Sequence, residues 1–195
     1  MKTAIITGAS SGLGVELLRA VAALCPEIEE FWLLARREDR LAAAAAQVEG
    51  KKTFLLPIDL TDYGRYDALR SALEEKMCLL DGGVRAFAFA SGLAAVTACF
   101  SLLQSGDDVV ISDDIYGGTY RLLEQIFGGF GIRFLLTNFG DPAAVEAKLS
   151  ERTKMVYFET PTNPMMRVAD IRRIAALAKR AGAVTVVDNT FHTPY

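Results

Sequence analysis

The chain has 195 residues, of which 51% are hydrophobic and 23% are charged, and its formal net charge is -3 at pH 7. This composition is typical of a globular chain that is long enough for one large domain or two small ones. The slightly acidic balance argues against nucleic acid as a partner. No apolar run in the sequence approaches the roughly 20 residues that are needed to span a bilayer.

The cysteines stand far apart, at Cys25, Cys78 and Cys99, and the chain has a single histidine, His192. This distribution fits neither a metal site nor a disulfide framework, so we expect free thiols in a reducing compartment and a cytoplasmic protein. Residues 1–7 lead directly into a predicted strand, and we therefore expect no secretion signal.

Strand and helix patterns alternate along the whole chain. Short apolar runs predict strands at residues 4–7, 31–35, 53–58, 85–90, 108–112, 133–136, 154–159 and 184–188. Helices are predicted at residues 13–24, 39–48, 65–80, 92–103, 118–130, 142–149 and 169–181. This alternation predicts a three-layer α/β fold, with a mostly parallel sheet and helices on both faces. One continuous sheet and two abutting half-sheets both fit the pattern.

The first strand is followed by a glycine-rich turn, Thr7-Gly8-Ala9-Ser10-Ser11-Gly12-Leu13-Gly14. Glycine there permits a tight turn and lets a pyrophosphate approach backbone N–H groups at the start of a helix, where the partial charge is positive. Arg36 and Arg37 follow the second strand, where a guanidinium suits a ribose 2′-phosphate. Asp59 follows the third strand, where it can hold an adenine amino group. The pattern predicts a dinucleotide site.

Residues 1–76 resemble the short-chain dehydrogenase/reductase family in its NADP-preferring form, through TGASSGLG and the stretch ARREDRL. The resemblance implies a Rossmann-like dinucleotide-binding half with NADP(H) as a candidate cofactor. It implies Gly8, Ser10, Gly12, Leu13 and Gly14 around the phosphates, Arg36 at the 2′-phosphate, and Asp59 with Leu60 at the adenine. The sequence contains no Tyr-x-x-x-Lys pair, from which that family takes its proton donor.

The second half carries a different set of predicted strand ends. Ser91-Gly92-Leu93 ends one strand and begins a helix, which gives another helix N-terminus suited to an anion. Tyr116 follows the next strand, and its ring can stack on a flat cofactor. Asp188 ends the last strand, where a carboxylate can pair with a protonated pyridine nitrogen.

Residues 73–195 resemble the Cys/Met-metabolism family of pyridoxal-phosphate enzymes, which includes the cystathionine synthases and lyases and methionine lyase. The resemblance rests on AFASGLAA, DDIYGGTYRL, VYFETPTNP and VVDNTFHTPY. It implies that Gly92 and Leu93, next to Ser91, hold the phosphate, and that Tyr116 stacks on the ring. It further implies Asp188 at the pyridine nitrogen, Asn163 nearby and Thr190 close to the phosphate.

In that family the Schiff-base lysine lies shortly after the DNTF segment, whereas this sequence stops at Tyr195. Lys179 lies within a predicted helix, away from the strand ends, and cannot replace it. We therefore expect pyridoxal phosphate to be bound only non-covalently.

The two resemblances meet in residues 71–77, a stretch that suits a helix of either family. We expect a hybrid with a Rossmann-like half at residues 1–76 and a truncated pyridoxal-phosphate-enzyme large domain at residues 77–195. A recombined gene, an engineered chimera and a wrongly joined sequence all fit this pattern.

The main interpretation is residual binding of cofactor phosphates without turnover, with no catalytic residue assigned. The first alternative is a fragment of a pyridoxal-phosphate-dependent transsulfuration lyase or transferase. The second is an NADP-dependent reductase-like nucleotide binder. We expect small-molecule cofactors as partners, but neither nucleic acid nor a membrane. We also expect copies of the chain to associate through the exposed edge of the strand at residues 184–188.

Overall fold

The computed structural model describes residues 2–192 and divides the chain into two compact units. The first unit comprises residues up to 79 together with 83–86, and the second comprises residues 80–82 and those from 87 onward. The start of the chain at Met1 and the last three residues of the motif that ends at Tyr195 lie outside the described residues.

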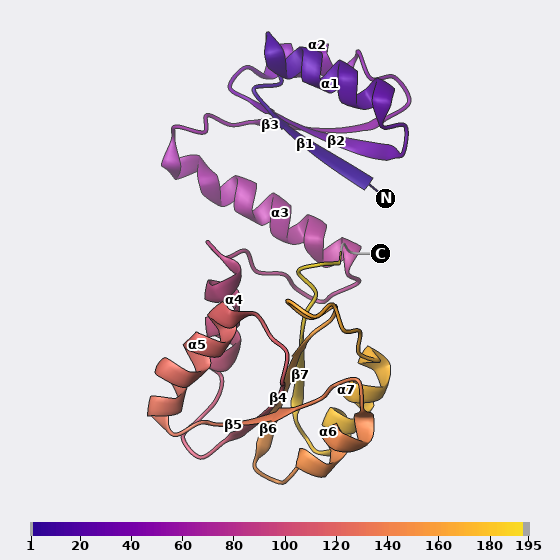
Figure 1. Cartoon of the computed structure of the whole chain (residues 1–195). Coiled ribbons are helices and arrows are strands. Elements are labelled where there is room, and N and C mark those ends of the chain that lie inside the picture. Colours follow the sequence, from indigo (N-terminus) through magenta and orange to yellow (C-terminus); the bar gives the residue numbers. More distant parts are fainter. Residues whose placement is uncertain (1, 193–195) are drawn as a thin grey trace. The chain divides into compact units, whose positions relative to one another are not determined.

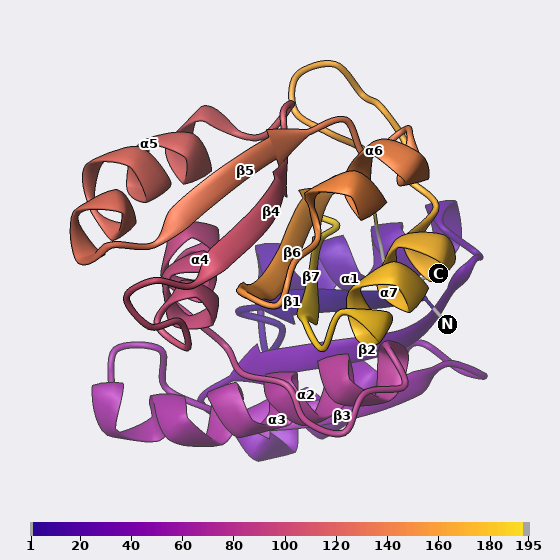
Figure 2. The same cartoon turned by 90° about the horizontal axis from the view of Figure 1, so that it is seen from below.

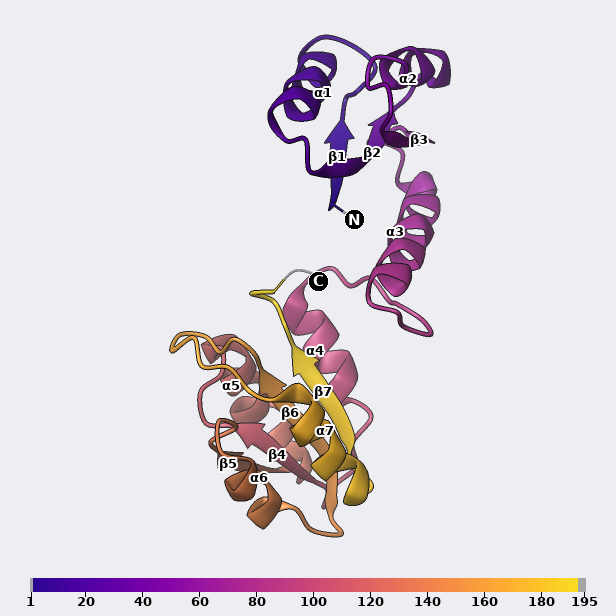
Figure 3. The same ribbon diagram turned by 90° about the vertical axis from the view of Figure 1, so that its right-hand side faces the viewer.

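The first unit is a three-stranded parallel sheet with helices on both faces (Figure 1). Its strands, in spatial order, are β1 (Lys2–Thr7), β2 (Ile28–Ala35) and β3 (Lys52–Pro57). Its helices are α1 (Leu13–Leu24), α2 (Glu38–Ala45), the short 3-10 helix η1 (Tyr63–Arg65) and α3 (Tyr66–Leu80). Helices α1 and α2 lie over the same face of the sheet (Figure 3).

Strand β2 separates two apolar cores, because successive side chains of a strand point to opposite faces. Phe31 and Leu33 are fully buried and pack with Leu18 of α1 and Leu41 of α2. Trp32 and Leu34 face the other way, where α3 covers them with Leu69, Ala72 and Leu73. The part of β2 that is buried on both faces must be apolar, which explains the continuous apolar run at residues 31–35.

A nearly buried ion pair holds α3 to this sheet. Lys76 Nζ lies 2.7 Å from Glu30 Oε1, and the two side chains are only 12% and 13% exposed. Burial raises the pKa of Glu30, but hydrogen bonds from Lys76 and from Trp32 outweigh burial and lower that pKa overall. The stretch at residues 71–77, where the two resemblances meet, is therefore part of a helix that packs on the first sheet.

The second unit is a four-stranded parallel sheet in the order β5-β4-β6-β7 (Figure 2). Its strands are β4 (Asp108–Ser112), β5 (Arg133–Thr137), β6 (Thr153–Glu159) and β7 (Val184–Asp188). Its helices are α4 (Gly92–Phe100), α5 (Gly117–Gln125), the 3-10 helix η2 (Phe127–Phe130), α6 (Pro142–Lys148) and α7 (Ile171–Arg180).

Each face of this sheet has its own core. One face buries Ile111 and Tyr157 with Phe100 of α4 and Leu123 of α5. The residues of the other face pack against α6 and α7 and include Val110, Val156, Phe158, Val145 and Ile174. The predicted α/β class, with parallel pairing and helices on both faces, is therefore confirmed.

The predicted strand at residues 85–90 is wrong, because these residues belong to neither sheet. Val84 is fully exposed, and Phe87 and Phe89 are 65% and 48% exposed. An apolar run forms a strand only where a neighbouring strand and a core receive it. Of the two arrangements that fit the sequence pattern, the described residues form two separate sheets and not one continuous sheet. Other boundaries shift less; the helix predicted at 118–130 is divided into α5 and η2.

Candidate functional site

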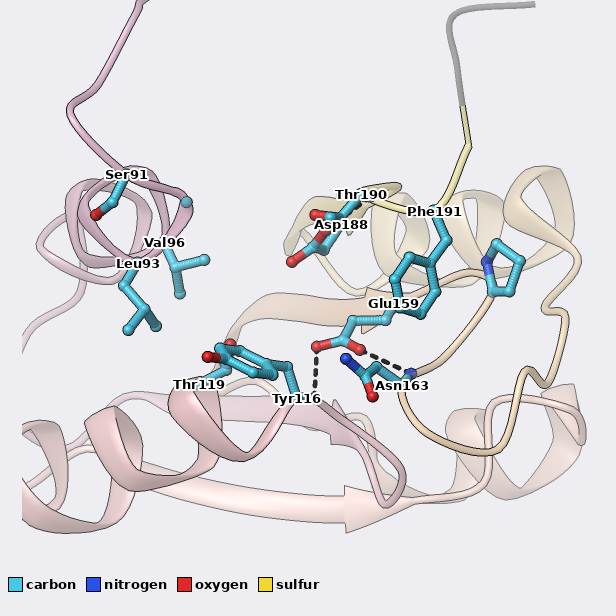
Figure 4. Close-up of a pocket in the computed structure, with 12 residues that line it drawn as sticks. Ser91, Leu93, Val96, Tyr116, Thr119, Glu159, Asn163, Asp188, Thr190 and Phe191 are labelled. Carbon is cyan, nitrogen blue, oxygen red and sulfur yellow. Dashed lines mark hydrogen bonds between the residues drawn. The ribbon is translucent and has the colours of Figure 1, made fainter.

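A pocket of about 330 Å³ opens at the carboxyl edge of the second sheet (Figure 4). Ligands of open parallel sheets bind at this edge, where loops and helix N-termini gather. The walls come from the start of α4, the loop after β4 with the first turn of α5, and the segments that follow β6 and β7. The lining residues are Ser91, Gly92, Leu93, Val96, Tyr116, Thr119, Glu159, Pro161, Asn163, Asp188, Thr190 and Phe191.

The start of α4 forms one wall of the pocket. Ser91 is extended and caps the helix, because its Oγ accepts a hydrogen bond from Ala94 N at 3.2 Å. Gly92 and Leu93, the first two helical residues, also line the pocket. The leading N–H groups of a helix lack partners within it, so this wall can receive an anion.

Glu159 connects two other walls. This residue ends β6 and is 4% exposed. Its Oε1 accepts a hydrogen bond from Tyr116 N at 2.7 Å, and its Oε2 accepts one from Asn163 N at 3.1 Å, as the dashed lines in Figure 4 show. Burial raises the pKa of the Glu159 carboxyl, the two N–H bonds offset part of the rise, and nearby Asp188 adds to it. One side chain thus fixes two pocket loops relative to each other.

Asp188 ends β7 and receives donors on both oxygens. Its Oδ1 accepts hydrogen bonds from Thr190 N at 3.0 Å and from the Thr190 hydroxyl. Its Oδ2 accepts one from the Tyr157 hydroxyl at 3.1 Å. The orientation of this carboxylate is therefore set by its neighbours in the folded chain.

The structure brings seven residues of the sequence prediction to this one pocket: Ser91, Gly92, Leu93, Tyr116, Asn163, Asp188 and Thr190. Sequence reasoning missed Thr119 and Glu159 as pocket residues. Glu159 carried a signal, since it is the polar residue that ends an apolar strand. Thr119 lies in the first turn of α5, directly after Tyr116, which caps that helix.

The residues predicted for dinucleotide binding lie in the first unit. Gly8 and Gly12 have φ angles of 67° and 54°, which glycine adopts readily. A Cβ on Gly14 would lie 2.1 Å from Gly8 O, so only glycine fits there. Leu13 begins α1 and is 85% exposed, and Ser10 lies within the turn. The glycine spacing thus reflects the close approach of α1 to the end of β1.

The other predicted residues of this half follow the neighbouring strands. Arg36 comes directly after β2, but Arg37 is the arginine that reaches the glycine turn, with Nη2 3.5 Å from Ser11 Oγ. The Asp59 carboxylate accepts hydrogen bonds from Thr61 N at 2.9 Å and from Thr61 Oγ1 at 2.7 Å. These bonds lower the pKa of Asp59, and Arg36 lowers it further. The predicted residues therefore share one edge of the first sheet.

Among residues 2–192, no group of three or more histidine, cysteine or acidic side chains is arranged to hold a metal ion. Within the same range, no helix has both the length and the apolar character needed to cross a membrane.

Fold and site together define an α/β protein with a cofactor-sized pocket at the carboxyl edge of a parallel sheet. Residues 45–195 match the family described as Cys/Met metabolism PLP-dependent enzyme. This match covers more than half of the sequence, and the chain belongs to that family.

Several known proteins are similar to about two thirds of this chain. Cystathionine beta-lyase of Lactococcus lactis subsp. cremoris is 48% identical over 126 residues, which cover 65% of this chain and 33% of that protein. Cystathionine gamma-synthase/O-acetylhomoserine (thiol)-lyase of Bacillus subtilis is 43% identical over 125 residues, 64% of this chain and 34% of the relative. The crystal structure of cystathionine gamma-lyase from Lactobacillus plantarum, complexed with L-serine, is 44% identical in sequence and has a TM-score of 0.64. This match covers 65% of this chain and 33% of the chain in that crystal structure.

The chain thus spans about a third of the length of the relatives that it matches. The family match begins at residue 45, within the segment that the sequence analysis assigned to the reductase-like half. The comparisons support the pyridoxal-phosphate family and give no support to a chimera. The short-chain dehydrogenase/reductase resemblance of residues 1–76 stays a prediction.

Proposed function

We propose that the second unit binds pyridoxal phosphate in the pocket, as the cofactor-binding part of a transsulfuration-type lyase or transferase. One observation carries this proposal: residues of three separate segments that stand out by residue type and position line the same pocket, together with Asn163 of a fourth segment, which the resemblance implies. The N–H groups of Gly92 and Leu93 would hold the phosphate, and Thr190, whose hydroxyl donates to Asp188, would lie close to it. Tyr116 would stack on the ring, and Asp188 would pair with the pyridine nitrogen.

The residues present fit such a cofactor. The Tyr116 side chain is 46% exposed and lines the pocket, so a face of its ring is available for stacking. A carboxylate offers about four lone-pair sites. Asp188 uses three for Thr190 and Tyr157, so capacity for one further donor remains. When bound, pyridoxal phosphate supplies an electron sink for carbanion chemistry on an amino acid.

The test uses 4′-deoxypyridoxine 5′-phosphate, which has the ring and the phosphate but no aldehyde that could react with surface lysines. We expect calorimetry to show binding to the whole chain. Asp188→Asn should weaken that binding about tenfold or more, because a charge-assisted hydrogen bond is lost.

The matched control is Asp113→Asn. Asp113 follows β4 and pairs with Arg167 at 3.6 Å, but it does not line the pocket. This substitution removes the same charge and should leave the affinity unchanged. Absence of binding by the wild-type chain, or equal loss in the two variants, would contradict the proposal.

We propose a second candidate function for the first unit, namely binding of the phosphates of NADP(H). The supporting observation is that a guanidinium lies at the glycine turn, where Arg37 contacts Ser11 at 3.5 Å. NADPH should bind in calorimetry, and NADH, which lacks the 2′-phosphate, should bind more weakly. Gly12→Asp should abolish binding by placing a carboxylate at the phosphates. Gly50→Asp, at another open glycine with positive φ in the same unit, should not.

A further inference from the structure

Tyr157 lies directly behind the pocket and does not line it. This residue is in the middle of β6, is 1% exposed, and belongs to the core beneath α4 and α5. Its ring centroid lies 5.3 Å from that of Phe100. A phenol buried this deeply needs a partner for its hydroxyl. Tyr157 finds one at the pocket, because its hydroxyl donates to Asp188 Oδ2 at 3.1 Å.

The strand register explains why these two groups meet. Tyr157 pairs with Val186 of β7, and Asp188 lies two residues further along the same strand. Side chains two residues apart point to the same face of a sheet. The Tyr157 side chain therefore reaches toward the carboxyl edge on the face that carries Asp188. This contact joins the apolar core to the carboxylate that the proposed cofactor would use.

The surroundings of the hydroxyl favour the neutral phenol. Burial and the neighbouring carboxylates of Asp188 and Glu159 raise the pKa of Tyr157 far above its ordinary value, while a hydrogen bond with Thr119 offsets part of the rise. The hydroxyl therefore keeps its proton over the whole working range of pH. A neutral phenol beside a carboxylate donates its single proton to that carboxylate.

We infer that Tyr157 is a positioning residue, whose hydroxyl holds Asp188 Oδ2 in the orientation that receives the ring nitrogen of a pyridine cofactor. The inference rests on the proposed pyridoxal-phosphate site. Thr190 holds the other oxygen of the same carboxylate. Loss of the phenol hydroxyl leaves the carboxylate held through Oδ1 alone, so no hydrogen bond from the core fixes the direction of Oδ2 any longer. The loss of affinity should therefore be confined to ligands whose ring nitrogen forms a hydrogen bond with Asp188.

The experiment compares two probes on the full chain. One is 4′-deoxypyridoxine 5′-phosphate, and the other is its analogue with a carbon–hydrogen group in place of the ring nitrogen. Tyr157→Phe removes a single oxygen from the core. We expect this variant to bind the nitrogen probe about tenfold more weakly than wild type does, the loss typical of one hydrogen bond to a charged group. Its affinity for the carbon analogue should be unchanged.

The readout is, for each variant, the affinity for the nitrogen probe divided by the affinity for the carbon analogue. Partial unfolding of Tyr157→Phe would weaken both probes by the same factor and would leave this ratio unchanged. The control is Tyr120→Phe, which removes a hydroxyl from a 43% exposed tyrosine of α5 that does not line the pocket. This control should keep the wild-type ratio.

The outcomes separate the inference from the function on which it rests. A lower ratio in Tyr157→Phe alone supports the positioning role. An unchanged ratio, with or without equal losses for both probes, overturns that role while leaving the cofactor site standing. Wild-type chain that binds neither probe, or does not discriminate between them, overturns the proposed use of Asp188 and the positioning role with it.

Discussion

Glu159 and Asp188 are register partners on neighbouring parallel strands, and both side chains line the same pocket. The two carboxylates have different partners. Glu159 accepts hydrogen bonds from two backbone N–H groups, whereas Asp188 accepts bonds from a phenol and from Thr190. Both oxygens of Glu159 thus serve loop geometry, while Asp188 keeps capacity for a ligand. We expect substitutions at the two positions to have different consequences.

Glu159→Gln should change the pH dependence of stability. The pKa of Glu159 is raised in the folded chain, so this state binds more protons than the unfolded state between the ordinary and the raised value. The free energy of unfolding of the wild type should therefore fall, relative to that of the variant, as the pH rises through this window. At the acid end, Glu159→Gln should be less stable by about 1–3 kcal/mol, because an amide nitrogen cannot accept from a backbone N–H.

Hydrogen exchange of the β6 and β7 amides, followed across that pH range, would measure this stability in the second unit alone. Glu151→Gln is the control, since Glu151 is exposed and does not line the pocket. A wild-type advantage that stays constant or grows with pH would contradict the expectation.

Asp108→Asn tests a buried carboxylate at the opposite end of the second sheet. Asp108 is 1% exposed and receives Arg133 Nε and Nη2, each at 2.6 Å. Its loss should destabilise the unit by about 1–3 kcal/mol, because a two-point charge-assisted bond is removed. Glu146→Gln breaks the 2.7 Å pair with Arg180, whose side chains are 59% and 64% exposed, and should cost under about 1 kcal/mol. Thermal unfolding measures both losses of stability. Equal losses in Asp108→Asn and Glu146→Gln would show that burial of the carboxylate does not determine how much its ion pair stabilises the unit.

Gly14→Ala should unfold or severely loosen the first unit. The added Cβ would lie 2.1 Å from Gly8 O and 2.5 Å from Gly8 C, so α1 would have to move away from β1. Gly50→Ala meets no atom within 4 Å and carries only the cost of a φ near 77°, which is about 1–2 kcal/mol. Fluorescence of Trp32, the one tryptophan of the chain, reports on this unit during denaturation. Similar losses in the two variants would argue against the steric account.

The ends of β4, β6 and β7 could be predicted from the sequence, because apolar runs and the polar residues at their ends are local signals. Asp188 and Tyr116 were assigned to the pocket from their positions after strands, and both line it. The contact of Tyr157 with Asp188 could not be predicted, because it depends on the register of β6 and β7. A tyrosine within an apolar strand looks like any other core residue until the register of that strand with its neighbour is known.

The failed strand at residues 85–90 has the same physical origin. Its alternation of alanine and phenylalanine suits a buried strand, yet neither sheet includes it. Strand formation depends on a partner that the local sequence does not contain. The ion pair of Glu30 with Lys76 could likewise not be predicted from the sequence, since the two residues are 46 positions apart in the chain.

Lys76→Met tests that ion pair and, with it, the attachment of α3 to the first sheet. Removing one member of a nearly buried pair leaves the Glu30 carboxylate without its main charge partner, which costs about 3–5 kcal/mol. The pKa of Glu30 is lowered in the folded wild type. Its contribution to stability is therefore complete above the ordinary glutamate pKa and is lost as the pH falls through the lowered value.

The stability gap between wild type and Lys76→Met should accordingly be widest near neutral pH and should narrow on acidification. Urea denaturation followed by Trp32 fluorescence measures this gap, because Trp32 donates to the same Glu30 oxygen. Arg70→Met is the matched control on α3, since Arg70 pairs with Asp67 at 3.0 Å through side chains that are 55% and 82% exposed. That exposed pair should contribute under about 1 kcal/mol at any pH. A gap for Lys76→Met that is as small as the control's, or that widens in acid, would show that apolar packing alone attaches α3 to the sheet.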